Sequence, residues 1–301
     1  WDNITCKGRF VETADRYIAW GPVMRDELRS HYQVPDERIA VCGVPHFDLH
    51  RDPRAAEARP DVLRTLGLSP DKPYLLLAMS SPRFAPNEID VVEWIARRIS
   101  DGEFGDTQLL VRPHPQNVTG NMADASWLPR LKALEAMPGV GVAFPKLVSS
   151  RLRWSMAEVD MLELAAMLSG AAVVLNSGST VSIDGLMHGR PVIITSFDGH
   201  RTRDYWDSAR RLMDYPHLKT LAGLGGVLVA KDFGQLVDLV RAEMTHPEAR
   251  QLERRRALLA ECFSDDGEST TRVVKALFAS LAAIPRQEAA ANPGDRKGQA
   301  G

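Results

Sequence analysis

Two short segments, each following an apolar run, carry side chains that could bind an anion. Ser80 and Ser81 are small enough for the backbone to approach a phosphate closely, and Arg83 could neutralise its charge. Arg112 and His114 belong to the sequence RPHP, in which two prolines restrict the backbone and so fix the direction of the imidazole. Such an imidazole can hydrogen-bond a phosphate or a base. A polar turn is the alternative for the first segment, and a purely structural histidine is the alternative for the second.

A third segment has the pattern of a strand, a tight turn and the start of a helix. Ser177 and Gly178 form the turn, where glycine permits a close approach by a ligand. Ser179 or Thr180 would cap the helix, whose free N–H groups and positive end attract an anion. Asp184 falls about one turn into this helix, where a carboxylate could hold ribose hydroxyls. A helix cap with an acidic first turn is the structural alternative.

Other chemistry-bearing patterns are weaker or missing from the sequence. Residues 197–201 (FDGHR) offer a histidine and an arginine, or a solvated loop, and the basic run 254–256 is interpreted as a solvated helix face. The sequence contains no GxGxxG, Walker, HExxH or GxSxG motif, which argues against common dinucleotide enzymes, nucleoside triphosphatases, zinc proteases and α/β-hydrolases. No cluster has metal-ligand spacing, so we expect no metal and no cofactor. The three cysteines, at 6, 42 and 262, are interpreted as reduced, small apolar residues.

The elements that must position these segments alternate between strands and helices. Apolar runs are predicted to be buried parallel strands, and the longer amphipathic stretches between them are predicted to be helices. This alternation predicts an α/β domain with a doubly wound, parallel, Rossmann-like sheet over residues 73–265, with ligands bound at the carboxyl ends of the strands. The predicted strands are 74–79, 108–111, 141–144, 172–176, 191–195 and 226–230, and the principal helices are 87–100, 158–168, 180–188 and 233–244.

The ends of the chain differ from this domain. Residues 1–50 contain a strand at 15–20, a helix at 22–31 and a strand at 38–42, a βαβ unit too small to bury its own core. Because residue 1 is Trp, we expect this unit to be the remnant of a truncated acceptor-side domain. Residues 51–72 are predicted to be a linker with a short helix at 60–66, residues 266–284 a helix packing back, and residues 285–301 a disordered tail.

Charge and hydropathy narrow the range of partners. The chain has 301 residues with 37 basic and 39 acidic side chains, a net charge of −2, so there is no basic field that would favour nucleic acid. The longest apolar runs are far shorter than the ~20 residues of a membrane span. A reducing cytoplasm fits the cysteine usage.

The combination of motifs resembles the C-terminal donor domain of GT-B glycosyltransferases. RPHP at 112–115 is followed about 60 residues later by SGST at 177–180 and then by GRPV at 189–192. This pattern is similar to the branch with CDP-glycerol glycerophosphotransferases, capsule Kdo transferases and bacterial sialyltransferases. Residues 1–8 (WDNITCKG) and 43–48 (GVPHFD) resemble segments late in the N-terminal domain of surface-polysaccharide transferases.

The resemblance implies that His114 contacts the nucleotide or its phosphate, that Ser179 and Thr180 bind phosphate, and that Asp184 meets the ribose or polyol. It implies transfer of a sugar or polyol phosphate from a nucleotide-activated donor, CMP or CDP being favoured, to a surface polysaccharide or cell-wall polymer. The catalytic base is not assigned, because we expect most of the acceptor-side domain to lie outside this sequence. His114 is a candidate for a catalytic role, and Asp2 and Asp15 are candidates without support.

The resemblance leaves alternatives open. UDP-N-acetylglucosamine 2-epimerases share the architecture, and a non-catalytic nucleotide-sugar-binding subunit is a third option. Phe144 and Lys146, which follow the third predicted strand, are candidate neighbours of the base but do not separate cytosine from uracil. The implied setting is the bacterial cytoplasm, with peripheral attachment to the inner face of the membrane through the missing domain left open, as is the oligomeric state.

Overall fold

Six parallel strands form the main sheet of the computed structural model, which describes residues 4–5, 10, 12–119, 124–149 and 155–282. The strands lie in the order β5-β4-β3-β6-β7-β8, and each neighbouring pair is parallel. This order confirms the predicted doubly wound Rossmann-like sheet. The bounds are β3 Tyr74–Ala78, β4 Gln108–Arg112, β5 Val140–Val142, β6 Val173–Asn176, β7 Val192–Thr195 and β8 Leu228–Ala230.

Helices cover both faces of this sheet. Alternate residues of each strand point to opposite faces, so Leu75 and Leu77 belong to one core cluster and Leu76 belongs to the other. Helices α3 (Glu88–Ser100), α5 (Trp127–Leu134) and α9 (Phe233–Thr245) cover the first face. The second face is covered by α2 (Pro53–Thr65), α6 (Glu158–Gly170), α7 (Val181–Met187), α8 (Pro216–Gly223) and α10 (Gln251–Cys262). Burial of both faces explains why the strands are continuous apolar runs.

Three short elements connect these layers near the carboxyl edge of the sheet. Helix α4 (Pro115–Val118) follows β4, and the 3-10 helices η3 (Tyr205–Asp207) and η4 (Ala209–Asp214) follow β7.

The sequence-based prediction had no helix at α5 or α8. The predicted tail at 285–301 and Cys6 lie outside the described residues, while Cys42 and Cys262 are buried free thiols.

The segment predicted to be a linker contains a longer helix than expected. Helix α2 begins at Pro53, where the Asp52 carboxylate accepts a hydrogen bond from the Arg54 N–H at 2.9 Å. Pro60, which the prediction took as the start of the helix, lies in its interior. Ala55 of α2 and Ala165 and Ala166 of α6 form a small buried cluster. Small side chains let the two helices approach closely. This packing offsets the cost of the backbone hydrogen bond that Pro60, which has no N–H group, cannot donate.

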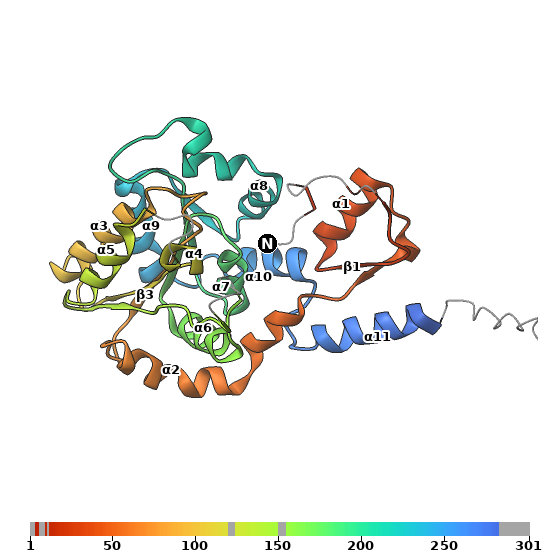
Figure 1. Ribbon diagram of the computed structural model, residues 1–301, viewed down its shortest axis with the longest axis horizontal. Coiled ribbons are helices and arrows are strands. Elements are labelled where there is room, and N and C mark those ends of the chain that lie inside the picture. The colour runs from red at the N-terminus through yellow and green to blue at the C-terminus, as the bar shows by residue number, and fades with distance from the viewer. Residues whose placement is uncertain (1–3, 6–9, 11, 120–123, 150–154, 283–301) are drawn as a thin grey trace, which may run out of the picture.

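A separate two-stranded parallel sheet lies beside the main body (Figure 1). It consists of β1 (Tyr17–Ala19) and β2 (Ile39–Val41), connected by α1 (Pro22–Tyr32) and the 3-10 helix η1 (Asp36–Arg38). Its core cluster contains only Ala19, Leu28 and Val34 as fully buried members among the described residues. At the start of α1, a Cβ added to Gly21 would lie 2.4 Å from the Glu261 carbonyl oxygen, so glycine is needed for contact with α10.

The last described helix returns to this small unit. Helix α11 (Ser269–Ala282) begins where the Asp48 carboxylate accepts the N–H groups of Ser269 and Thr270 at 3.0 and 2.8 Å. Asp48 belongs to η2 (Pro45–Arg51), far away in the sequence. Arg272 donates to the Cys42 carbonyl at 2.8 Å. These contacts join α11 to the segment between the two sheets.

Replacing Asp48 with alanine should therefore lower the free energy of unfolding. The variant leaves two N–H groups of α11 without their acceptor, and loss of such a cap costs about 1 kcal/mol. Urea denaturation followed by far-UV circular dichroism measures the change. The matched control is Asp71→Ala, since Asp71 is an exposed loop carboxylate. Equal stability of the two variants would contradict a capping role for Asp48.

The basic run at 254–256 does not lie wholly on a solvated face as predicted. Arg254 is buried, and its guanidinium lies 3.3 Å from the Glu243 carboxylate of α9. Arg255 and Arg256 are exposed, as expected. None of the helices in the described ranges combines the length and apolar character needed to cross a bilayer.

Candidate functional site

The predicted binding segments lie side by side at the carboxyl edge of the main sheet. They follow β4, β3, β6 and β7, which are consecutive neighbours in the sheet. Between β3 and β6 the chain continues in opposite directions from the centre of the sheet, a topological switch point where doubly wound folds leave a crevice for a ligand. The spatial order of the strands thus brings together segments that are about 100 residues apart in the sequence.

His114 is held as a neutral hydrogen-bond donor. Its Nδ1 accepts the Gln116 N–H at 3.1 Å, and its own backbone N–H donates to the Asn117 side-chain oxygen, which closes a capping box at the start of α4. Burial and the nearby Arg112 charge lower the pKa of His114 to about 4. A neutral imidazole with Nδ1 occupied as an acceptor carries its proton on Nε2. The ring can therefore donate one hydrogen bond but supplies no positive charge near neutral pH.

The turn after β6 is organised by Asn176, which sequence reasoning did not single out. The Asn176 side-chain oxygen accepts the N–H groups of Gly178 and Ser179 at 2.8 and 2.9 Å. Gly178 has a φ of +84°, and a Cβ there would lie 3.0 Å from Leu218, so the turn requires glycine on both counts. The Ser179 hydroxyl is buried without a hydrogen-bond partner among the described residues. The Gly178 and Ser179 N–H groups are therefore already paired within the turn and are not available to a ligand.

Glu88 holds the loop after β3 in place through a hydrogen bond. It is a second residue that the sequence motifs did not indicate. The Ser80 N–H donates to Glu88 Oε2 at 2.7 Å, and Glu88 is only 3% exposed. Burial raises the pKa of Glu88 to about 7, and hydrogen bonding from Ser177 and the Ser80 N–H counteracts part of this rise. The Ser80 hydroxyl is buried and unpartnered within the described residues, whereas Ser81 is half-buried and Arg83 is exposed.

Arg112 is committed to the fold. Its guanidinium pairs with the fully buried Asp160 of α6 and donates to the Ala143 carbonyl at 3.1 Å. The other Asp160 oxygen accepts the Lys146 N–H at 2.7 Å, and the Lys146 ammonium pairs with Glu163. Arg112 therefore ties the ends of β4 and β5 to α6, and its contact with phosphate stays a prediction.

Asp184 also has a partner that the sequence did not reveal. Its carboxylate lies 2.7 Å from His50 Nε2, and His50 Nδ1 lies 3.1 Å from His188 Nε2. Asp184 and His50 are buried, and burial together with the His50 contact lowers the pKa of His188 to about 3. This chain of side chains joins α7 to η2, and the contact of Asp184 with ribose stays a prediction.

The fourth predicted segment borders a polar cleft of about 620 Å³. Asp198 is buried and accepts the Ser208 hydroxyl at 2.7 Å, while His200 and Arg201 are exposed. The cleft extends from the loop after β3 to the start of α5, and its lining includes Pro82, Asn87, Arg130, His200, Arg201 and Arg203.

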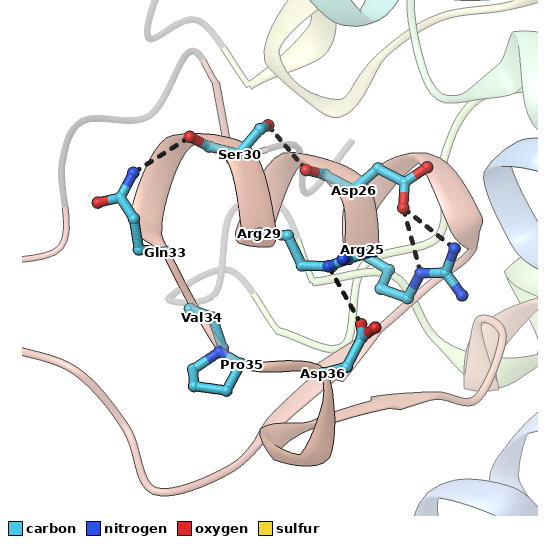
Figure 2. Close-up of a pocket in the computed structure, with 8 residues that line it drawn as sticks. All are labelled: Arg25, Asp26, Arg29, Ser30, Gln33, Val34, Pro35 and Asp36. Atoms are coloured by element: carbon cyan, nitrogen blue, oxygen red, sulfur yellow. Dashed lines mark hydrogen bonds and ion pairs between the residues drawn. The ribbon is translucent and has the colours of Figure 1, made fainter.

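A larger depression, of about 800 Å³, lies over α1 and carries no comparable chemistry. Figure 2 shows that its polar side chains pair among themselves or with nearby backbone. Asp26 pairs with Arg25 at 3.1 Å, and Arg29 lies 3.4 Å from Asp36. We therefore place the candidate site at the carboxyl edge of the main sheet. Within the described part of the chain, no group of three or more His, Cys, Asp or Glu side chains could hold a metal ion.

Known structures share this fold. The class is a Rossmann-like α/β fold of the kind found in GT-B proteins. No family model matches the chain, and no curated protein does. Among solved structures, MnaA of S. aureus in complex with UDP is similar, with a TM-score of 0.58 and 13% identity over 90% of this chain and 62% of that one.

Two further structures are comparably similar. One is described as a UDP-N-acetylglucosamine 2-epimerase of Listeria monocytogenes, with a TM-score of 0.56 and 15% identity over 91% of this chain and 62% of that one. The other is the wall teichoic acid polymerase TagF, with a TM-score of 0.54 and 17% identity over 89% and 58%. The chain thus spans about 60% of the length of these proteins.

Proposed function

We propose that the carboxyl edge of the main sheet binds a nucleotide-activated donor, and that the protein transfers a sugar or polyol phosphate from it to a surface or cell-wall polymer. The observation that carries this proposal is the neutral, oriented His114 beside the serine-rich loop after β3, with the loop after β6 next along the same edge of the sheet. His114 would offer its imidazole N–H to the ligand, and the hydroxyls of Ser80 and Ser179, which are buried without a hydrogen-bond partner among the described residues, belong to the two loops. The fold that this chain shares with TagF, a polymerase, supports the proposal.

The task of these groups would be electrostatic. Negative charge accumulates on the departing phosphate as the donor bond breaks, and donors already in place stabilise that charge more in the transition state than in the ground state. His114 Nε2–H would donate to the phosphate or to the base. Ser179 and Thr180 would contact phosphate at the turn after β6, and the exposed Arg83 would contribute positive charge.

A binding titration tests the proposal directly. CMP, CDP, UDP and GDP are titrated into the chain by isothermal calorimetry, and we expect cytidine nucleotides to bind more tightly than GDP. Each binding reaction is repeated with Gly178→Val, which places a branched side chain in the turn against Leu218 and should abolish binding. Selective binding of GDP, or no binding of any of the four, would contradict the proposed donor.

Epimerisation of a UDP-sugar is a second candidate function, favoured by the fold that this chain shares with MnaA in its complex with UDP. An epimerase forms product from UDP-N-acetylglucosamine alone, whereas a transferase requires an acceptor. Incubation of the nucleotide sugar without acceptor, followed by chromatography of the sugar products, separates the two.

We further propose that the small unit around β1 and β2 belongs to the acceptor-side domain, which would supply the catalytic base. Its two strands bury few residues, and α11 carries an exposed apolar stripe at Val274, Leu277, Phe278 and Leu281. Residues spaced by three and four lie on one face of a helix. This face would pack against the remainder of that domain, and the same domain could provide peripheral contact with a membrane.

A further inference from the structure

The loop 198–203, which follows β7, is fixed to the start of α3 by one side chain. Asn87, the N-cap residue of α3, donates from Nδ2 to the backbone carbonyls of Asp198 and Arg201 at 3.0 and 3.1 Å. The Asn87 side-chain oxygen accepts a hydrogen bond from the Arg203 guanidinium at 2.9 Å. A single amide group therefore holds this loop at three points.

The buried carboxylate of Asp198 holds the same loop from within. It accepts the Arg203 N–H at 3.1 Å and the Ser208 hydroxyl at 2.7 Å. Gly199 has a φ of +71°, and a Cβ there would lie 2.9 Å from the Cβ of Asp90 on α3, so glycine lets the loop pack closely against the helix. The conformation of the loop is thus set by the fold before any ligand binds.

This loop lines the polar cleft of about 620 Å³ and brings unpaired positive charge to it. Arg130, also in the lining, is neutralised because its guanidinium lies 2.7 Å from carboxylate oxygens of Asp90 and Glu93. Arg201 and Arg203 differ from it, since neither guanidinium has an acidic side chain at ion-pair distance among the residues that the structure describes.

The chemistry of the cleft favours an anion. Asp124, the other acidic residue of the lining, accepts the Ser126 N–H at 2.8 Å just before α5. A guanidinium offers several N–H donors in a planar fork that matches the oxygen atoms of a carboxylate or a phosphate. Because Arg201 and Arg203 stand on a loop that is already ordered, less conformational freedom is lost when they bind such a group.

The cleft adjoins the proposed donor site without including its residues. The lining reaches Pro82, which lies between Ser81 and Arg83 in the loop after β3. Of the described residues that we assign to the donor, including His114 and Ser179, none lines the cleft. A ligand group in the cleft would therefore lie beside the donor rather than in its place.

We propose that this cleft is an oxyanion subsite for the acceptor, and that the acceptor is an acidic polymer that bears phosphate or carboxylate groups. Arg201 and Arg203 bind the oxyanion, and Asn87 and Asp198 are positioning residues that hold the loop. The role of the bound group as an acceptor rests on the proposed function, whereas the binding of an oxyanion by the two arginines does not.

Isothermal calorimetry at low ionic strength tests the subsite with short oligomers of glycerol phosphate, of galacturonate and of neutral glucose. We expect saturable binding of an acidic oligomer and none of the neutral one, and the acidic oligomer that binds identifies the oxyanion. Arg201→Gln and Arg203→Gln should each weaken this binding about tenfold, because a charged hydrogen-bond donor is lost. Arg201→Lys, which keeps the charge, should weaken it less. Arg64→Gln, which removes an exposed arginine on α2 at the other face of the sheet, should leave it unchanged.

A second titration separates the subsite from the donor site. The protein is first saturated with whichever of CMP, CDP or UDP it binds most tightly, and the acidic oligomer should still bind. Nucleotide affinity should be unchanged in Arg201→Gln and reduced in His114→Ala. A thermal melt of each variant shows whether it folds, and Arg201→Gln decides the outcome if Arg203→Gln does not.

The outcomes distinguish this inference from the proposed function. No binding of either acidic oligomer, equal binding of the neutral oligomer, full affinity in the glutamine variants, or competition with the nucleotide would each overturn the subsite, even if nucleotides bind. Oligomer binding that requires Arg201 and Arg203, in a protein that binds no nucleotide, would support the oxyanion site and overturn the proposed function.

Discussion

Replacing His114 with alanine should reduce the proposed donor turnover by about 10²–10³, equivalent to about 2.7–4 kcal/mol in the activation barrier. The variant removes the Nε2–H donor that we place against the departing phosphate or the base. Because the pKa of His114 is lowered to about 4, the ring is already neutral from about pH 6 to pH 8. The loss should therefore be the same across that range.

Initial-rate measurements with the donor and a polymer acceptor give the size of the effect, and a thermal melt shows whether the variant folds. His246→Ala is a suitable control, because His246 is exposed at the end of α9, away from the carboxyl edge. Turnover by His114→Ala within about twofold of the wild type would remove His114 from the site. A loss that appeared only below about pH 5 would instead indicate that a charged imidazole is the active form.

Replacing Asp160 with asparagine should lower the free energy of unfolding by about 3–5 kcal/mol. Asp160 is fully buried and pairs with the guanidinium of Arg112, which is 5% exposed. The variant leaves the Arg112 charge in the interior without a counter-ion, so the cost of desolvating the Arg112 guanidinium is no longer offset by attraction. Because Arg112 also holds the Ala143 carbonyl, the ends of β4 and β5 should loosen, and nucleotide binding should weaken with them.

Urea denaturation measures this effect, and a double variant isolates its cause. Replacing both partners, as Arg112→Met with Asp160→Leu, removes the unpaired charge and should recover most of the lost stability. Glu163→Gln, which disturbs only the more exposed pair with Lys146, should change stability by less than about 1 kcal/mol. If Asp160→Asn unfolded at the wild-type urea concentration, the pair would not carry the structural role we assign to it.

The sequence was a good guide to elements whose signal is local. Each predicted strand of the main sheet overlaps a strand of the structure, because a run of apolar residues between polar turns has few other stable arrangements. Helix α2 was the exception among the predicted elements. Pro60 resembles a helix start by local rules, and only packing against Ala165 and Ala166 of α6 lets the helix continue on both sides of it.

The sequence was a weaker guide to the roles of charged residues. Arg112, Asp184 and Arg254 each stand in a pattern that indicates exposure or ligand binding. In the structure, each has a buried partner on another element. Residue type and spacing cannot distinguish a charged side chain that binds a ligand from one that pairs with another residue of the protein, because the same side chain can do either.

Taken alone, the sequence determined the alternation of strands and helices, the parallel sheet and the segments that follow each strand. Those features depend on residues within a few turns of one another. Only the tertiary structure decided that β3 lies beside β6, that Glu88 accepts the Ser80 N–H, and that Asn176 organises the turn after β6. The physical reason is that strand order and buried pairing arise from packing across the whole sheet. Residues distant in the chain must then satisfy each other's charges and hydrogen bonds once water is excluded.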